Sequence, residues 1–259
     1  MKINFVKMNS QGNDFIIIDN TKKSYKLTKH QIKKICSREN IGCDQLLILD
    51  VKDSQNIICK IFNQDGSEAS QCGNGMRAIM FFLYKYYKYT DASIVVKDLH
   101  YPVHFETEND IRVNMGKPKF LAKHETSFSY SPLMLGNFHC IIYSDDCYND
   151  RDIITQDLYD IYEDVPNISF ILNFHNYVSQ KDNYIKIKVN ERGAGWTKSC
   201  GSGASATAAF VFNNPKLIGD NINKLLVEQD GGRLAVMSLD HDIYLSGPTT
   251  FEYDGSWND

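Results

Sequence analysis

The sequence lacks any apolar run approaching the ~20 residues that a membrane-spanning helix needs. Its opening residues, Met1 to Lys7, lead directly into a strand-like segment without the apolar core of a secretory signal. We therefore expect a cytoplasmic protein that does not associate with membranes.

An excess of positive charge is also absent. The formal net charge is −4, and the paired lysines at 22–23 and 33–34 lie among polar, helix-like residues. Proteins that bind nucleic acids or anionic membranes in general carry a strongly basic surface. We interpret these lysines as a solvated face, and we expect a small-molecule substrate instead of a nucleic acid.

Signatures of disulfide frameworks and zinc sites are missing as well. The seven cysteines are odd in number, and no Cys-X-X-Cys or close His/Cys pair gives the spacing of zinc ligands. We expect thiols and no metal. Cys36, Cys59 and Cys140 have apolar neighbours, which predicts small buried hydrophobic residues.

The sequence does contain an internal duplication. Cys72 and Cys200 each open the phrase Cys-Gly-X-Gly-X-X-Ala, and they lie 128 residues apart in a chain of 259. The segments 12–18 and 136–142 both read Gly-Asn followed by a strand-like run, at a spacing of 124 residues. This drift in spacing is typical of small loop insertions between two related domains.

The same order of elements is predicted in both halves. We expect outer helices at 28–40 and 152–164, strands at 57–62 and 184–189, and helices at 76–87 and 204–213 after the cysteine phrases. The closing segments 94–115 and 225–246 each predict strand, turn, strand, strand. The sequence therefore predicts an α+β fold of two similar domains, 1–117 and 118–248, with the tail 249–259 returning to the first.

Each cysteine phrase is expected at a turn from strand to helix. The glycines allow close approach of a ligand to the backbone, and the N-terminus of the following helix offers unpaired N–H groups to a carboxylate. The same electric field favours a thiolate over a thiol. Two such thiols facing one carbon could act as base and acid on opposite sides, which is the chemistry of stereoinversion.

Gly-X-Gly-X-X-Ala also occurs in dinucleotide-binding sites, but this interpretation fits poorly. Polar residues 68–71 and 196–199 stand where a buried strand should end, and no acidic residue is placed to hold a ribose. A P-loop is excluded because Gly-Lys-[Ser/Thr] is absent.

Six motifs, in order along nearly the whole chain, resemble the diaminopimelate epimerase family. They are Phe5-Val6-Lys7-Met8 followed by Gly12-Asn13-Asp14-Phe15, Ile41-Gly42-Cys43-Asp44-Gln45-Leu46-Leu47, Asn63-Gln64-Asp65-Gly66-Ser67-Glu68, Gln71-Cys72-Gly73-Asn74-Gly75, Glu191-Arg192-Gly193-Ala194-Gly195 with Thr197, and Cys200-Gly201-Ser202-Gly203. The combination is highly specific.

The resemblance implies two pseudo-symmetric domains, each a mostly antiparallel sheet wrapped around a central helix, with the active site in the cleft between them. It implies an epimerase that interconverts LL- and meso-2,6-diaminopimelate, in lysine and peptidoglycan precursor biosynthesis, without pyridoxal phosphate or any other cofactor. Cys72 and Cys200 match the catalytic cysteines, one a thiolate and the other a thiol, with the two states exchanging on turnover.

Further roles also follow from the resemblance alone. His139 and Glu191 match residues that tune the cysteine pKa values, and Tyr253 matches a tyrosine associated with a homodimer. The residues that match the substrate site are Asn13, Gln45, Asn63, Gly73, Asn74, Asn137, Asn167, Glu191, Arg192, Gly201 and Ser202.

Two positions depart from the family pattern. Trp196 stands where Glu is common, and Phe138 replaces Pro in Gly-Asn-Pro-His. Two other hypotheses remain open at this point: a related cofactor-independent racemase for proline-like or histidine-like substrates, and a binding module that retains the fold without catalysis. The amide set with Arg192 argues against the first, and the presence of both cysteines argues against the second.

Overall fold

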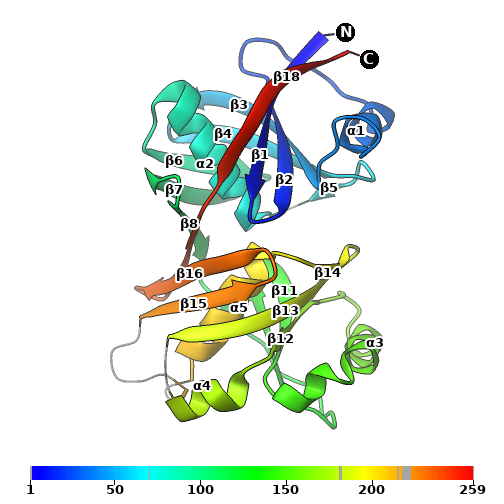
Figure 1. Cartoon of the computed structure of the whole chain (residues 1–259), viewed down its shortest axis with the longest axis vertical. Coiled ribbons are helices and arrows are strands. Elements are labelled where there is room, and N and C mark those ends of the chain that lie inside the picture. The colour runs from blue at the N-terminus through cyan, green and yellow to red at the C-terminus, as the bar shows by residue number, and fades with distance from the viewer. Residues whose placement is uncertain (1, 70, 181–182, 215, 218–222, 259) are drawn as a thin grey trace. The chain divides into compact units, whose positions relative to one another are not determined.

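The computed structural model describes residues 2–69, 71–180, 183–214, 216–217 and 223–258. The chain forms two compact units (Figure 1). The first unit comprises Met1–Asn114 together with Gly247–Asp259, and the second comprises Met115–Ser246.

The first unit is built on a mixed, mostly antiparallel sheet. Its strands pair in the order β18-β1-β2-β3-β4-β6-β7-β8, and the short strand β5 pairs with the other end of β4. Among the described pairings of this unit, only β2–β3 and β4–β6 are parallel. The strands are β1 (Lys2–Ser10), β2 (Asn13–Asp19), β3 (Gln45–Asp53), β4 (Asn56–Asn63), β5 (Glu68–Ala69), β6 (Asp91–Val96), β7 (Leu99–Thr107), β8 (Asp110–Gly116) and β18 (Thr250–Asn258).

The second unit repeats this pairing. Its strands pair in the order β9-β10-β11-β12-β13-β15-β16-β17, and β14 also pairs with β13. The parallel pairs β11–β12 and β13–β15 occupy the same places in this order as β2–β3 and β4–β6 do in the first unit. The predicted duplicated α+β fold is therefore confirmed. The strands are β9 (Lys119–Phe120), β10 (Tyr130–Leu135), β11 (Asn137–Ile142), β12 (Asn167–Ile171), β13 (Tyr184–Glu191), β14 (Gly195–Thr197), β15 (Lys224–Gln229), β16 (Gly232–Leu239) and β17 (Asp242–Gly247).

Each sheet wraps around a central helix, α2 (Gly73–Tyr87) in the first unit and α5 (Gly201–Phe212) in the second (Figure 1). The first eleven residues of each helix are buried. Helices surrounded by protein on all sides carry small or apolar residues around their circumference, as α5 does with its run of Gly, Ser and Ala. Both helices begin three residues before the predicted starts at 76 and 204, because each preceding cysteine caps the helix and makes the glycine-rich turn helical.

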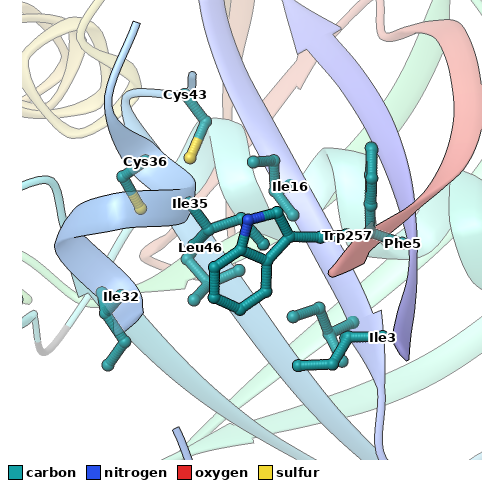
Figure 2. Close-up of a cluster of buried hydrophobic side chains, with 10 residues drawn as sticks. Ile3, Phe5, Ile16, Ile32, Ile35, Cys36, Cys43, Leu46 and Trp257 are labelled. Atoms are coloured by element: carbon teal, nitrogen blue, oxygen red, sulfur yellow. The ribbon is translucent and has the colours of Figure 1, made fainter. Parts of the chain in front are cut away.

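A second core lies between each sheet and an outer helix. Figure 2 shows this cluster in the first unit, where Trp257 of β18 is surrounded by side chains from β1, β2, β3 and α1 (Lys29–Cys36). Helix α3 (Arg151–Ile161) contributes Ile154 and Leu158 to the corresponding cluster of the second unit. Cys36, Cys59 and Cys140 are buried, as predicted.

Two short helical segments were not predicted, η1 (Asp145–Tyr148) and α4 (Phe174–Gln180). Helix α1 also ends earlier than the expected residue 40, at Cys36, because Ser37 adopts an extended conformation. None of the helices in the described ranges has both the length and the apolarity needed to span a membrane.

Candidate functional site

The two cysteines that begin the central helices occupy equivalent positions. Cys72 is the N-cap of α2, where its Sγ accepts a hydrogen bond from the backbone N–H of Gly75 at 3.3 Å. Cys200 is the N-cap of α5 and accepts from Gly203 N at 3.3 Å. Each sulfur therefore lies at the positive end of a helix dipole and takes up one of its unpaired N–H groups.

The second glycine of each phrase leaves room for the sulfur. A Cβ atom at Gly75 would lie 3.4 Å from Cys72 Sγ, and one at Gly203 would lie 3.2 Å from Cys200 Sγ. The Cβ at Gly203 would also meet Val189 Cγ2 at 3.1 Å and Ser169 Oγ at 3.2 Å. The distance at Gly75 is an ordinary van der Waals contact, so the steric restriction to glycine applies to Gly203 in the second unit.

In the first unit, predicted amides lie around Cys72. Asn13, at the start of β2, donates from Nδ2 to Asp44 Oδ2 at 3.0 Å, which leaves its Oδ1 to accept from Asn74 Nδ2 at 3.4 Å. The Cys72 thiol lies 3.9 Å from the same oxygen and can donate to it. Asn13, Cys72 and Asn74 thus form one hydrogen-bonded group.

Gln45 and Asn63 form a second pair of amides in the first unit. They lie opposite each other where β3 begins and β4 ends, and Gln45 Nε2 donates to Asn63 Oδ1 at 3.0 Å. Asn63 in turn donates from Nδ2 to Ser67 Oγ at 3.0 Å. Both amide planes are held by these contacts.

In the second unit, Asn167 and Arg192 lie together. The backbone N–H of Arg192 donates to Asn167 Oδ1 at 3.0 Å, and Asn167 Nδ2 donates to the carbonyl of Phe138 at 3.4 Å. The Arg192 guanidinium is partly exposed and pairs with Asp164 at 2.5 Å. Asn137, the first residue of β11, is half-buried.

Burial and the Glu191 carboxylate together keep the proton on Cys200. Burial raises the pKa of the Cys200 thiol well above its ordinary value, and the nearby Glu191 carboxylate raises this pKa further. Ser202 Oγ, 3.5 Å from Cys200 Sγ, and the backbone N–H of Gly203 lower this pKa by less than burial and Glu191 raise it. Glu191 in turn accepts a hydrogen bond from Thr197 Oγ1. In this arrangement Cys200 is a thiol at neutral pH.

His139 is completely buried on β11, directly opposite Asn167 of β12. Neither ring nitrogen has a hydrogen-bond partner among the described residues. Burial, with a smaller contribution from the positive charge of Arg192, lowers the pKa of His139 to about 3. The imidazole is therefore neutral at physiological pH, and it adds no positive charge to the second unit.

The buried histidine should make stability depend on pH. Below pH ~6.5 the unfolded chain binds a proton at residue 139 that the native state excludes until pH falls to about 3, so stability decreases on acidification. At pH 5 this loss amounts to about 2 kcal/mol. Urea unfolding of the wild type and His139→Leu at pH 7 and pH 5 should show the smaller pH effect in the variant. Equal pH effects would contradict this account.

An ionic cluster in the first unit was not predicted from the sequence. Arg38 donates to both carboxylate oxygens of Asp14, at 2.6 and 2.8 Å, and to Asp44 Oδ1 at 2.6 Å. The buried Lys7 contacts Asp14 and the carbonyl of Gly42. Although burial alone would raise it, the pKa of Asp14 is held far below its ordinary value by these hydrogen bonds and by the charge of Lys7.

This cluster supports the amides around Cys72, because Asp44 is the residue that accepts the hydrogen bond from Asn13. A signal for it was present in the sequence. Asp14 and Asp44 are acidic residues inside otherwise apolar segments, and each stands next to a predicted substrate residue, Asn13 or Gln45. Their cationic partners are distant in sequence and could not be assigned from the pattern.

The remaining singled-out residues take part in aromatic contacts within their units. Tyr253 of β18 is 44% exposed and packs edge-to-face against Phe5, with ring centroids 6.0 Å apart. Trp196 of β14 contacts Phe170 at a centroid distance of 5.7 Å, and the buried Phe138 packs against Tyr162 at 4.9 Å. The two departures from the family pattern thus fill aromatic clusters within the second unit.

Comparison with known proteins gives consistent results for sequence and fold. The sequence model of the family described as "Diaminopimelate epimerase" matches residues 5–121. The diaminopimelate epimerase of Buchnera aphidicola subsp. Acyrthosiphon pisum (strain APS) is 35% identical, covering 98% of this chain and 95% of that protein. The diaminopimelate epimerase of Legionella pneumophila (strain Lens) is 32% identical, and the match covers 99% of this chain and 99% of that protein.

Solved structures share the fold at low sequence identity. A phenazine biosynthesis protein of the PhzF family from Bacillus anthracis superposes with a TM-score of 0.71 at 14% identity over the whole of both chains. A hydroxyproline epimerase from Agrobacterium vitis gives 0.69 at 9% identity, covering 98% of this chain and 92% of that one. Together with the full-length relatives, which carry the assignment, these findings show that the chain belongs to the diaminopimelate epimerase family and is an epimerase.

Proposed function

We propose that the protein interconverts LL- and meso-2,6-diaminopimelate, with Cys72 and Cys200 as a two-base pair and with no cofactor. The observation that carries the proposal is the position of the two thiols, each of which caps the buried helix at the centre of its unit. A family assignment alone does not identify the acid and the base, whereas a thiol at a helix N-terminus has a physical reason to ionise.

In this mechanism the two cysteines work on opposite faces of one α-carbon. A thiolate takes the α-proton and becomes a thiol, while the electron pair of the broken C–H bond remains on the substrate as a carbanion. The opposite thiol gives its proton to the other face and becomes a thiolate. Configuration is inverted, and the next turnover begins with the two protonation states exchanged.

Formation of the carbanion requires stabilisation of the substrate carboxylate. The N-terminal turns of α2 and α5 carry Gly73, Asn74, Gly201 and Ser202, and their backbone N–H groups and helix dipoles are suited to bind a carboxylate there. We assign these four residues to the reacting end of the substrate.

The other predicted residues suit the second amino-acid group of the substrate. Amide side chains can meet both ammonium and carboxylate groups, and Arg192 can bind a carboxylate through two parallel hydrogen bonds. Its pairing with Asp164 is solvent-exposed, and exposed pairs are weak enough for a substrate carboxylate to replace them. We therefore assign Asn13, Gln45, Asn63, Asn137, Asn167, Glu191 and Arg192 to substrate binding.

We also propose that the protein acts as a homodimer through the face that carries Tyr253. A tyrosine ring exposed to 44% on a strand is the kind of amphipathic side chain that interfaces cover. This part of the proposal is independent of the acid–base chemistry.

A substrate panel tests the proposal. Purified protein in D2O, without added cofactor, should replace the α-proton of LL-diaminopimelate by deuterium and form the meso isomer, as followed by NMR and chiral chromatography. Proline, hydroxyproline and histidine at the same concentration should react far more slowly. Faster inversion of any of these three would show that the substrate assignment is wrong.

A further inference from the structure

Arg77 is a fully buried guanidinium on α2, with an exposure of 0%. Its Nη1 donates to the carbonyl of Pro248 at 2.7 Å and its Nη2 to Asn74 Oδ1 at 2.7 Å, whereas Nε has no hydrogen-bond partner in the described part of the chain. Burial lowers the pKa of Arg77 to about 10, so the group keeps its positive charge at neutral pH.

Buried charges are ordinarily paired with an opposite charge, because removal from water is costly. No carboxylate among the described residues forms an ion pair with Arg77. A negative charge on Cys72 would raise the pKa of Arg77, and this electrostatic effect is reciprocal. Arg77 therefore favours the thiolate form of Cys72.

Hydrogen bonds also connect the two residues. Arg77 donates to Oδ1 of Asn74, and this fixes the Asn74 amide so that its Nδ2 faces Asn13. Asn13 Oδ1 in turn lies 3.9 Å from Cys72 Sγ. Arg77 thus sets the orientation of the amides beside the sulfur as well as the local charge.

Two titratable groups near Cys72, Cys59 and Glu68, oppose this effect only weakly. Cys59 on β4 is neutral, because burial raises its pKa far above the ordinary value. Glu68 on β5, which acts on Cys59, is exposed to solvent, where water screens its charge.

The second unit has the opposite arrangement. The residue equivalent to Arg77 in the repeated phrase is Ser205, an uncharged residue whose Oγ donates to the carbonyl of Gly201 at 2.9 Å. The residue after the asparagine of the preceding strand is the neutral Gln64 in the first unit and Glu191 in the second. One cysteine therefore has a buried cation nearby, and the other has a carboxylate.

We infer that Arg77 is a positioning residue that places the resting thiolate on Cys72, so that the unliganded enzyme is preset with Cys72 as the base and Cys200 as the acid. The inference rests on the proposed cysteine mechanism. It extends that mechanism by naming the residue that makes two related halves chemically different.

Alkylation by iodoacetamide tests the inference without any substrate. The thiolate sulfur attacks the methylene carbon and iodide leaves, so the pH dependence of the rate reports ionisation of each cysteine separately when peptides are quantified by mass spectrometry. In the wild type the midpoint for Cys72 should lie below that for Cys200. In Arg77→Met, alkylation of Cys72 at pH 7 should slow about tenfold, equivalent to one pH unit in the midpoint.

Two further variants separate charge from packing. Arg77→Lys keeps the charge and should keep the Cys72 midpoint within a few tenths of a pH unit of the wild type, while Ser205→Ala is the matched control in the second unit and should leave Cys72 unchanged. An unchanged Cys72 midpoint in a folded Arg77→Met would overturn the inference. If that variant does not fold, a wild-type Cys72 midpoint at or above that of Cys200 would overturn it.

Because alkylation needs no substrate, the two proposals fail separately. A Cys72 alkylation midpoint below that of Cys200, in a protein that does not turn over diaminopimelate, would refute the proposed function alone. Turnover of diaminopimelate with no difference between the cysteines would refute the role of Arg77 alone.

Discussion

Replacing Cys72 or Cys200 by alanine is expected to lower kcat/KM for epimerisation by about a hundredfold to ten-thousandfold. Each cysteine is assigned one proton transfer on one face of the substrate, and a positioned acid or base contributes an effect of this size. Both variants should fail in both directions, because the acid of one direction is the base of the other. Coupled assays started from LL- and from meso-diaminopimelate measure this directly.

Cys147→Ala is the matched control for loss of a thiol. Cys147 is half-buried on η1 and has no place among the residues around either helix N-terminus, so its replacement should leave kcat/KM unchanged. Under the proposed mechanism each of the Cys72 and Cys200 variants still has one base, so slow exchange of the α-proton with retained configuration is expected. Inversion at the wild-type rate by either variant would refute the two-base assignment.

The largest expected loss of stability comes from Asp14→Ala. The side chain of Lys7 is only 5% exposed, and removal of Asp14 leaves its ammonium group buried without a carboxylate. Breaking a buried pair in this way costs about 3–5 kcal/mol, chiefly because of the remaining charge. Urea unfolding at pH 7 should show the corresponding decrease in the free energy of unfolding.

Arg38→Ala separates this effect from the loss of hydrogen bonds to the same carboxylate. The Arg38 side chain is 55% exposed, so solvent can replace its contacts with Asp14 and Asp44, and the expected loss is about 1 kcal/mol or less. If both variants lost the same small amount, the buried ammonium of Lys7 would not be the cause.

The sequence was sufficient to predict the duplicated fold, because the signals that repeat are local. The cysteine phrases and the Gly-Asn strand starts each occupy a few consecutive residues, and their equal order in the two halves requires equal topology. The starts of α2 and α5 were placed too late, since glycine is a poor helix former and the capping by the cysteine sulfurs is visible only in three dimensions.

Long-range electrostatics could not be predicted in the same way. Lys7 lies on β1 and Asp14 on β2, while Arg38 and Asp44 lie in the loop between α1 and β3. No short pattern relates a lysine on β1 to an arginine after α1. The role of Arg77 could not be predicted for a similar reason. An arginine in a helix ordinarily indicates a solvated face, and only the structure shows that Arg77 is completely buried.

The pairing of β18 with β1 has a consequence for the order in which the two units can be completed during synthesis. The second unit is contiguous in sequence, so all of its strands are available once the ribosome has released residue 247. The first unit, although its other strands precede the second unit in the chain, needs residues 250–258 to complete its sheet. The carbonyl of Pro248 that accepts from Arg77 also arrives with this segment, so the charge beside Cys72 gains its full set of contacts only after the whole second unit has been translated.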